Sequence, residues 1–214
     1  MQQFNYWGND EVIMDQIVYS KNVVEFVTVA NEYCSTIENV SHLTAEENLA
    51  KLQKLLPLLY LKASVVGKIE MVMDEELEKF VNELDYNVLH QKWLQLLGEN
   101  DGFHEVFDPN IQFGEETVRA SVSENLMDIY QDLKDCITNY SIGNEEVMND
   151  AISECIYHFE EFWGQQLVNV MRAVHMLVYS GADFSTESSN DEAVPGKGNP
   201  KWLDKFWGTD QEEE

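Results

Sequence analysis

Three carboxylates share one face of a predicted helix in the second half of the chain. Glu124, Asp128 and Asp135, with Gln131 between them, are spaced by four, three and four residues, and this spacing aligns side chains along a helix. A line of carboxylates can bind a cation, although a complete site would need ligands from a second helix. The line also lies opposite the apolar stripe of its own helix, so we favour the interpretation that it is a solvated face.

The next predicted helix carries a second polar line. Its members are Glu154, His158, Glu161, Gln165 and Arg172. Glu154 and His158 are four residues apart, so they can bind one ion together or hydrogen-bond to each other. Helical di-iron proteins use Glu-x-x-His from two helices, and this motif does not occur in the sequence. We therefore expect no metal site and no cofactor.

Arg172 and His175 stand in an otherwise apolar stretch of the same helix. An arginine there could bind an anionic ligand through its planar guanidinium group, while the histidine accepts or donates a proton. Alternatively, Arg172 pairs with an acid such as Glu32 or Asp128 and His175 packs at an edge, which is the interpretation we favour. A hydrolase, or a metal- or anion-binding protein, would use a polar site between the fourth and fifth helices formed by Glu124, Asp128, His158, Arg172 and His175.

Motifs for nucleophilic or phosphate chemistry are missing. The sequence contains neither Gly-x-Ser-x-Gly nor a phosphate-binding glycine loop. Cys34, Cys136 and Cys155 are an odd number, lie far apart and form no Cys-x-x-Cys pair. This pattern is typical of buried thiols in a reducing compartment rather than of a disulfide or zinc framework. We expect a cytoplasmic protein that is not an enzyme.

An aromatic segment follows a polar linker near the C-terminus. From Gly181 to Pro200 the sequence is rich in Ser, Thr, Asn, Asp, Glu, Pro and Gly, and Trp202, Phe206 and Trp207 come next. Residues 181–214 are therefore predicted to be a flexible acidic tail with a short aromatic segment at 201–207. Such aromatic residues commonly anchor to a groove. The groove would belong to a partner, to a neighbouring copy or to the protein's own bundle.

The charge of the chain limits its partners. Forty acidic residues against thirteen lysines and arginines give a net charge of −27. Direct binding of nucleic acid or of an anionic membrane surface is not expected from such a chain. No segment approaches the ~20 apolar residues of a membrane helix, and the acidic N-terminus does not resemble a secretory signal. The expected partner is another protein, with a basic one among the options, and the sequence leaves the oligomeric state open.

Apolar periodicity predicts five main helices over residues 12–37, 44–66, 83–97, 116–140 and 144–179. Thr44 and Glu47 have the spacing of a capping box, and Pro57 predicts a kink rather than an end. Residues 67–82 are irregular, with a short helical turn expected after Asp74, and no strand pattern competes with the helices. The fold class is therefore all-α, an up-and-down bundle in one domain (residues 1–180) with a long C-terminal helix.

Four stretches resemble an uncharacterised bacterial family known as a domain of unknown function. They are residues 23–33 (VVEFVTVANEY), 55–63 (LLPLLYLKA), 121–135 (SVSENLMDIYQDLKD) and 159–164 (FEEFWG). The resemblance covers about residues 17–180 and leaves out the aromatic tail. It implies an all-helical bacterial protein and assigns no activity, substrate, cofactor or site. The leading hypothesis is a non-enzymatic acidic interaction or adaptor protein, and the polar site between the fourth and fifth helices is the rival.

Overall fold

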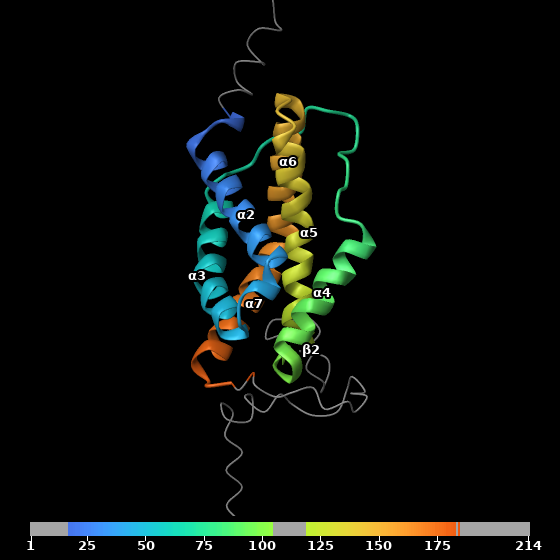
Figure 1. Cartoon of the computed structure of the whole chain (residues 1–214). Coiled ribbons are helices and arrows are strands. Elements are labelled where there is room, and N and C mark those ends of the chain that lie inside the picture. Colours follow the sequence, from blue (N-terminus) through green and yellow to red (C-terminus); the bar gives the residue numbers. More distant parts are fainter. Residues whose placement is uncertain (1–16, 105–118, 183, 185–214) are drawn as a thin grey trace, which may run out of the picture.

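The predicted helices form an up-and-down bundle, shown in Figure 1, and the all-α fold class is confirmed. The computed structural model describes residues 17–104, 119–182 and 184. Its main helices are α2 (Lys21–Glu38), α3 (Ala45–Ser64), α4 (Glu83–Leu97), α5 (Val122–Ser141), α6 (Glu145–His158) and α7 (Gly164–Tyr179). Two 3₁₀ turns, η1 (Val40–His42) and η2 (Gly98–Asn100), follow α2 and α4. None of the described helices is long and apolar enough to span a membrane.

The start of α3 follows the predicted capping chemistry. The backbone N–H of Glu47 donates to the Thr44 hydroxyl at 3.3 Å, and the Thr44 N–H donates to the Glu47 carboxylate at 3.0 Å. This reciprocal pair satisfies two amides that a helix start leaves without intrahelical partners. The helix then continues through Pro57, which is exposed to solvent, and ends at Ser64.

The core is built from the apolar stripes of α2, α3, α5 and α7, and α4 and α6 also contribute buried residues to it. On α2 the stripe consists of Val23, Phe26, Ala30, Cys34 and Ile37, all buried. It packs against α3 and α5, and α7 packs against α3 and α5. Two large buried side chains of this core donate to backbone carbonyls: Tyr33 donates to Leu126 at 2.9 Å and Trp93 to Ile37 at 3.2 Å.

Two predicted helix starts lie later than expected. The chain turns at Tyr19 and Ser20, so α2 begins at Lys21; the predicted positions before residue 17 lie outside the described residues. Tyr19 lies in this turn and is 51% exposed. α5 begins at Val122 instead of residue 116, because residues 119–121 form a strand.

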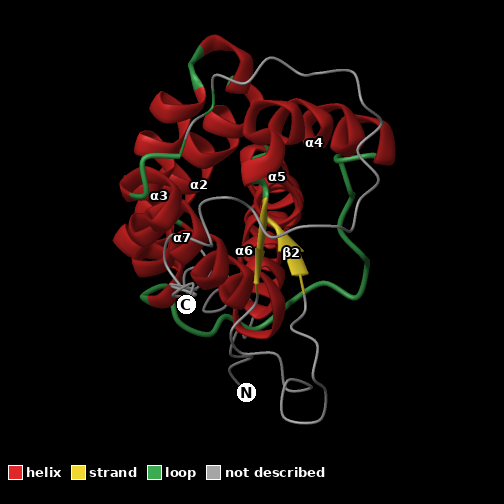
Figure 2. Ribbon diagram, turned by 90° about the horizontal axis from the view of Figure 1, so that it is seen from below, coloured by secondary structure: helices red, strands yellow, loops and turns green. Residues whose placement is uncertain are grey.

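That strand corrects the expectation of a strandless chain. β1 (Gly102–His104) and β2 (Arg119–Ser121) pair antiparallel, with Phe103 opposite Ala120, and Figure 2 shows the pair beside α5. Buried Asp101 joins this pair to the helix, since it accepts the Ser123 N–H at 2.7 Å on its carboxylate and the Val122 N–H at 2.8 Å on its carbonyl. Three residues per strand are too few for a visible alternation of apolar and polar positions.

Residues 145–179 are helical throughout, as predicted, but one turn is widened. α6 passes into the π-helical turn η4 (Phe159–Trp163) and then into α7 at Gly164. A Cβ atom at Gly164 would lie 2.3 Å from the Phe159 carbonyl oxygen. Glycine at this position therefore lets the widened turn close onto itself.

Between α3 and α4 the chain forms a strap, residues 67–81, which contains no helix; the expected turn after Asp74 is only a bend. In Figure 1 the strap is the green coil that leaves the upper end of α3, passes the upper end of the bundle and descends to α4.

Candidate functional site

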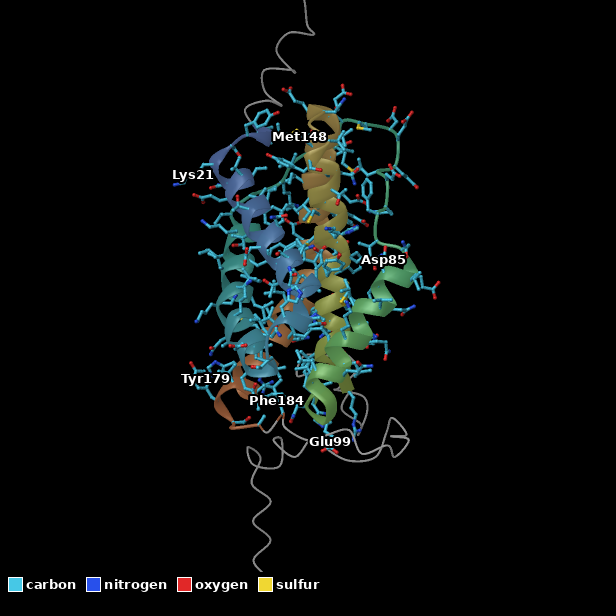
Figure 3. The ribbon with its side chains drawn as sticks, in the orientation of Figure 1. Lys21, Asp85, Glu99, Met148, Tyr179 and Phe184 are labelled. Atoms are coloured by element: carbon cyan, nitrogen blue, oxygen red, sulfur yellow. The ribbon has the colours of Figure 1, made fainter. Side chains whose placement is uncertain are left out.

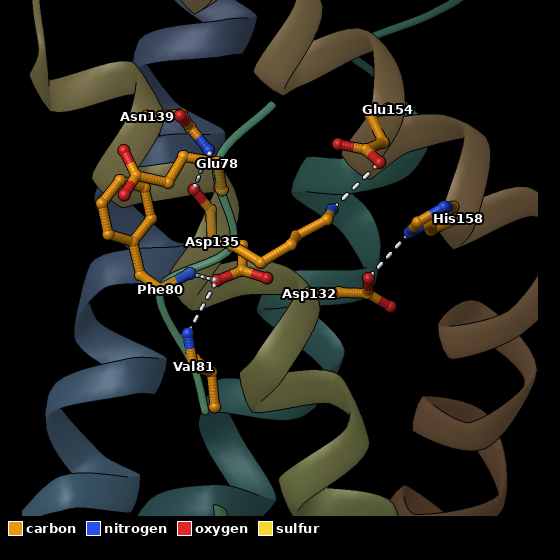
Figure 4. Close-up of polar contacts among 9 residues, drawn as sticks. Glu78, Phe80, Val81, Asp132, Asp135, Asn139, Glu154 and His158 are labelled. Carbon is orange, nitrogen blue, oxygen red and sulfur yellow. Dashed lines mark hydrogen bonds and ion pairs between the residues drawn. The ribbon is translucent and has the colours of Figure 1, made fainter. Parts of the chain in front are cut away.

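The strap lies against α5 and α6, and two buried carboxylates bind its backbone. Asp150 of α6, which is 0% exposed, accepts the Val72 N–H on one carboxylate oxygen and the Met73 N–H on the other, both at 2.8 Å. Asp135 of α5 accepts the Phe80 and Val81 N–H groups on a single oxygen, at 2.8 and 3.1 Å (Figure 4). Each carboxylate thus bonds two consecutive amides, a charge-assisted arrangement that compensates for its burial.

Side-chain amides and a hydroxyl bind the strap's carbonyls. Asn139 donates to the Glu78 carbonyl at 3.0 Å, and Asn149 donates to the Glu70 carbonyl at 2.8 Å. The Ser153 hydroxyl donates to the Ile69 carbonyl at 2.6 Å. An extended segment without a neighbouring strand must satisfy its backbone groups in some other way. We call these five residues the strap clamp: Asp135, Asn139, Asn149, Asp150 and Ser153.

A polar cavity of about 10 Å³ lies between the strap, α5 and α6, and it has room for about one water molecule. Two ion pairs border it. His158 Nδ1 lies 2.7 Å from an Asp132 oxygen, and Lys79 of the strap lies 3.0 Å from a Glu154 oxygen. Burial raises the pKa of the Asp132 carboxyl, and the hydrogen bond and charge of His158 oppose that shift.

Two thiols also line the cavity, Cys136 and Cys155. Contact with the Cys136 thiol and burial raise the pKa of Cys155 well above its usual value. Burial likewise raises the pKa of Cys34. The attacking form of cysteine is the thiolate, so neither of these thiols is suited to act as a nucleophile at neutral pH. All three cysteines are buried and free in the structure.

The five residues of the predicted polar site are not joined into one site. No hydrogen bond or ion pair links any two of them within the described structure. Glu124 is exposed in the first turn of α5. Asp128 is half-buried and accepts the Tyr86 hydroxyl at 2.7 Å and the Gln166 amide at 3.0 Å. Because both of its oxygens are occupied in this way, Asp128 does not project into solvent as the solvated-face interpretation implied.

His158 pairs with Asp132 of α5 rather than with Glu154, the partner considered from helical spacing. Arg172 is exposed and makes no ion pair with a described residue, so the expected pairing with Glu32 or Asp128 does not occur there. Glu32 instead binds Lys51 at 2.7 Å. His175 is exposed and contacts the Tyr179 ring, with ring centroids 4.8 Å apart and the two planes tilted by 56°.

The strap clamp was not recognised from the sequence, although a weak signal exists. Asp135 and Asn139 are four residues apart, as are Asn149 and Ser153, and all four lie next to apolar core positions. Short polar side chains at the edge of an apolar stripe indicate a buried polar contact. They do not indicate which backbone they bind.

The predicted partner anchor, Trp202, Phe206 and Trp207, lies outside the described residues. Within them, no group of three or more His, Cys, Asp and Glu side chains is placed to hold a metal ion. With space for about one water, the cavity offers no room for an organic substrate. The five residues of the strap clamp bind the strap itself.

Known proteins of similar sequence and structure give the family of this chain. The chain is similar to the protein BF1032 from Bacteroides fragilis, known from a crystal structure, with 39% identity and a TM-score of 0.69 over 81% of this chain and 99% of that one. No curated protein matches. Residues 17–180 match the family described as a domain of unknown function, DUF5063. The matched range contains the whole bundle and the strap clamp, and the chain belongs to this family.

Proposed function

We propose that this protein is a non-enzymatic interaction protein that binds a basic, partly apolar segment of another protein. The observation that carries the proposal is the strap, whose backbone is bound by buried side chains of α5 and α6 while its acidic side chains face solvent. A binding surface whose backbone is already fixed loses less conformational entropy when a partner docks.

The acidic part of the proposed binding surface comes from one stretch of the sequence, residues 70–85. It consists of exposed carboxylates of the strap and of the start of α4, which we call the acidic ledge: Glu70, Asp74, Glu75, Glu76, Glu78, Glu83 and Asp85. Asp85 lies at the outer edge of the bundle in Figure 3. Lys79 is the only lysine or arginine between residues 69 and 91, and it is bound to Glu154. A ledge of one sign attracts a partner of the opposite sign and accelerates its association.

Apolar side chains are exposed among these acids. Met71 and Val72 of the strap are 52% and 50% exposed, and Leu84 and Val88 of α4 are 72% and 48% exposed. Methionine adapts its shape to different partners, and exposed apolar residues beside charges provide the contacts that remain when salt screens the charges. The matching partner therefore carries lysine or arginine interspersed with apolar residues.

A direct test uses a synthetic amphipathic peptide of lysine and leucine, labelled for fluorescence anisotropy, and the full chain. Glu75→Lys/Glu76→Lys should weaken binding of this peptide about tenfold, or about 1.4 kcal/mol, because it reverses two charges of the ledge. The matched control Glu46→Lys/Glu161→Lys makes the same change in net charge at two exposed positions outside the ledge. Equal weakening by both variants would show that the peptide senses total charge alone and that the ledge is not the binding surface.

The apolar part of the proposal needs a separate measurement. Leu84→Ser should weaken peptide binding at high salt, where screening removes most of the charge attraction. If this variant binds the peptide as the unmodified chain does at high salt, the apolar residues of the ledge make no contact with it.

A further inference from the structure

A second surface is an open groove along one face of α3, a helix that lies across the bundle from α4 in Figure 1. Its volume is about 500 Å³. The apolar side chains that line it are Leu43, Ala50, Leu55 and Leu58. Leu43 and Leu58 are about two-fifths exposed. Leu61, one helical turn after Leu58, is more than half exposed and continues the same face.

Lysines border this groove. Lys51 and Lys54 line it, and Lys51 is bound to Glu32. Lys54 is exposed and makes no ion pair with a described residue. Glu47 also lines the groove, but its carboxylate caps the start of α3. The groove therefore fits an apolar segment that is followed by acidic residues.

We propose that the aromatic segment at residues 201–207 of this same chain docks in the α3 groove. In a helical conformation Trp202, Leu203, Phe206 and Trp207 would fall within an arc of about 140°, because successive residues differ by about 100°. Asp204 would then face away. The acids Asp210, Glu212, Glu213 and Glu214 follow the segment and supply the charge that complements Lys54.

The positions of the chain ends make the docking sterically possible. Tyr179 and Phe184 lie at the lower end of the bundle in Figure 3, the end at which α3 begins in Figure 1. Phe184 is partly buried against the core, which fixes the starting point of the tail. From Phe184 to Trp202 the chain can span about 60 Å when extended. α3 is about 30 Å long, so every part of the groove is within reach.

This docking does not depend on the acidic ledge, because the groove and the ledge are formed by different elements. A segment tethered to its own groove acts at an effective concentration in the millimolar range, so even a modest apolar contact suffices to occupy the site. Docking would therefore cover Leu58 and Leu61, whose side chains are exposed in the described structure.

Cross-linking of engineered thiols in the full chain tests the proposal. The native cysteines are buried, so a bismaleimide reagent will react first with cysteines placed on the surface. Ala50→Cys/Thr209→Cys joins the groove lining to the end of the aromatic segment and leaves Lys54 in place. Lys92→Cys/Thr209→Cys, with the first thiol on an exposed position of α4, is the matched control. We expect the groove pair to form an intramolecular cross-link at least about tenfold faster than the control pair, because docking raises the local concentration.

Two further variants show whether the contact is the proposed one. Leu58→Glu places a charge in the groove at a partly exposed position, and Trp202→Ala/Phe206→Ala removes the anchor without touching the bundle. Either change should reduce the rate of the groove pair to that of the control, with circular dichroism confirming an intact bundle. Equal rates for the two pairs in the unchanged background would overturn the docking. Cross-linked dimers in place of monomers would also overturn it, since a second copy would then occupy the groove.

Discussion

The buried carboxylates of this protein bind backbone amides. Asp150 and Asp135 each accept two consecutive N–H groups of the strap, and Asp101 accepts the Ser123 N–H near the start of α5. A carboxylate removed from water must be compensated by strong hydrogen bonds. These acids therefore contribute to the fold, and they differ in role from the exposed acids that dominate the net charge.

Loss of one such carboxylate should be costly. Asp150→Ala leaves the Val72 and Met73 amides without their acceptor, so we expect the free energy of unfolding to fall by about 3 kcal/mol. Asp150→Asn keeps one carbonyl oxygen and should lose less. Urea denaturation gives these values, and Asp74→Ala, at an exposed strap position, should change them by less than about 0.5 kcal/mol. Similar losses for Asp150→Ala and Asp74→Ala would mean that the strap contributes little to stability.

Asp128 should control the titration of Tyr86. Burial, followed by the hydrogen bond and charge of Asp128, raises the pKa of Tyr86 above its ordinary value of 10.0. Asp128→Asn should therefore lower this pKa, while burial keeps it above the ordinary value. Glu124→Gln should lower it less, since Glu124 acts only through its charge. Ring-carbon NMR of labelled tyrosine measures both changes, and an unchanged Tyr86 titration in Asp128→Asn would contradict the hydrogen bond.

The same shift has a consequence for alkaline stability. A tyrosine whose pKa is higher in the folded state holds its proton when the unfolded chain has lost it, so stability is complete below about pH 10 and declines as the pH rises further. Burial also raises the pKa of Tyr130, and the hydrogen bond from its hydroxyl to Glu38 adds to the effect. Asp128→Asn should make the decline less steep, which denaturation at several alkaline pH values will show.

At the scale of elements, the widened turn η4 is the feature that sets the last helix apart. Its carbonyl at Phe159 accepts the Gly164 N–H, and the chain passes so close that a side chain at Gly164 has no room. The turn also shifts the helix face, so that Phe162 is 58% exposed while Trp163 is fully buried. The position of η4 and the identity of Gly164 are therefore linked.

The sign of the change in the free energy of unfolding in Gly164→Ala tests that link. Within an ordinary helix the change from glycine to alanine is stabilising by about 1 kcal/mol. Here the added Cβ would meet the Phe159 carbonyl oxygen at 2.3 Å, so we expect a destabilisation of about 1–3 kcal/mol instead. Thermal or urea denaturation measures the difference. A gain in stability would indicate that η4 is readily replaced by a regular α-helical turn.

Elements with strong periodicity could be predicted, and so could the irregular connection at residues 67–82, but the side chains that bind the strap could not. The buried stripe of α2 from Val23 to Ile37 and the Thr44–Glu47 capping box follow from spacing alone, because both are local patterns. The role of Asp135 depends on amides more than fifty residues earlier. Periodicity gives the face on which Asp135 lies but not what packs on that face. For the same reason the sequence could suggest His158 as a polar residue but not Asp132 as its partner.

At the scale of the whole molecule, a net charge of −27 dominates. Like charges repel within the compact state, and salt screens that repulsion. We expect the thermal midpoint of unfolding to rise as sodium chloride is raised from about 10 mM to about 1 M, over which the Debye length falls from about 30 to 3 Å. Differential scanning calorimetry measures this rise.

Divalent ions distinguish screening from specific binding. Magnesium chloride and calcium chloride should raise the midpoint only as far as sodium chloride of equal ionic strength does, because the described residues contain no cluster able to hold a metal ion. A larger effect at micromolar concentrations of either ion would contradict this expectation and reveal a cation site.

The strap clamp also distinguishes residues that the fold requires from exposed strap residues that it does not require. The backbone of the strap is specified by side chains on α5 and α6, so its outward residues carry little information about the fold and can drift without unfolding the bundle. Across the family we expect the clamp residues to persist while positions such as Glu75 and Glu76 vary. Members of the family would then share the same bundle and differ in the exposed strap residues, and therefore in the partners that they bind.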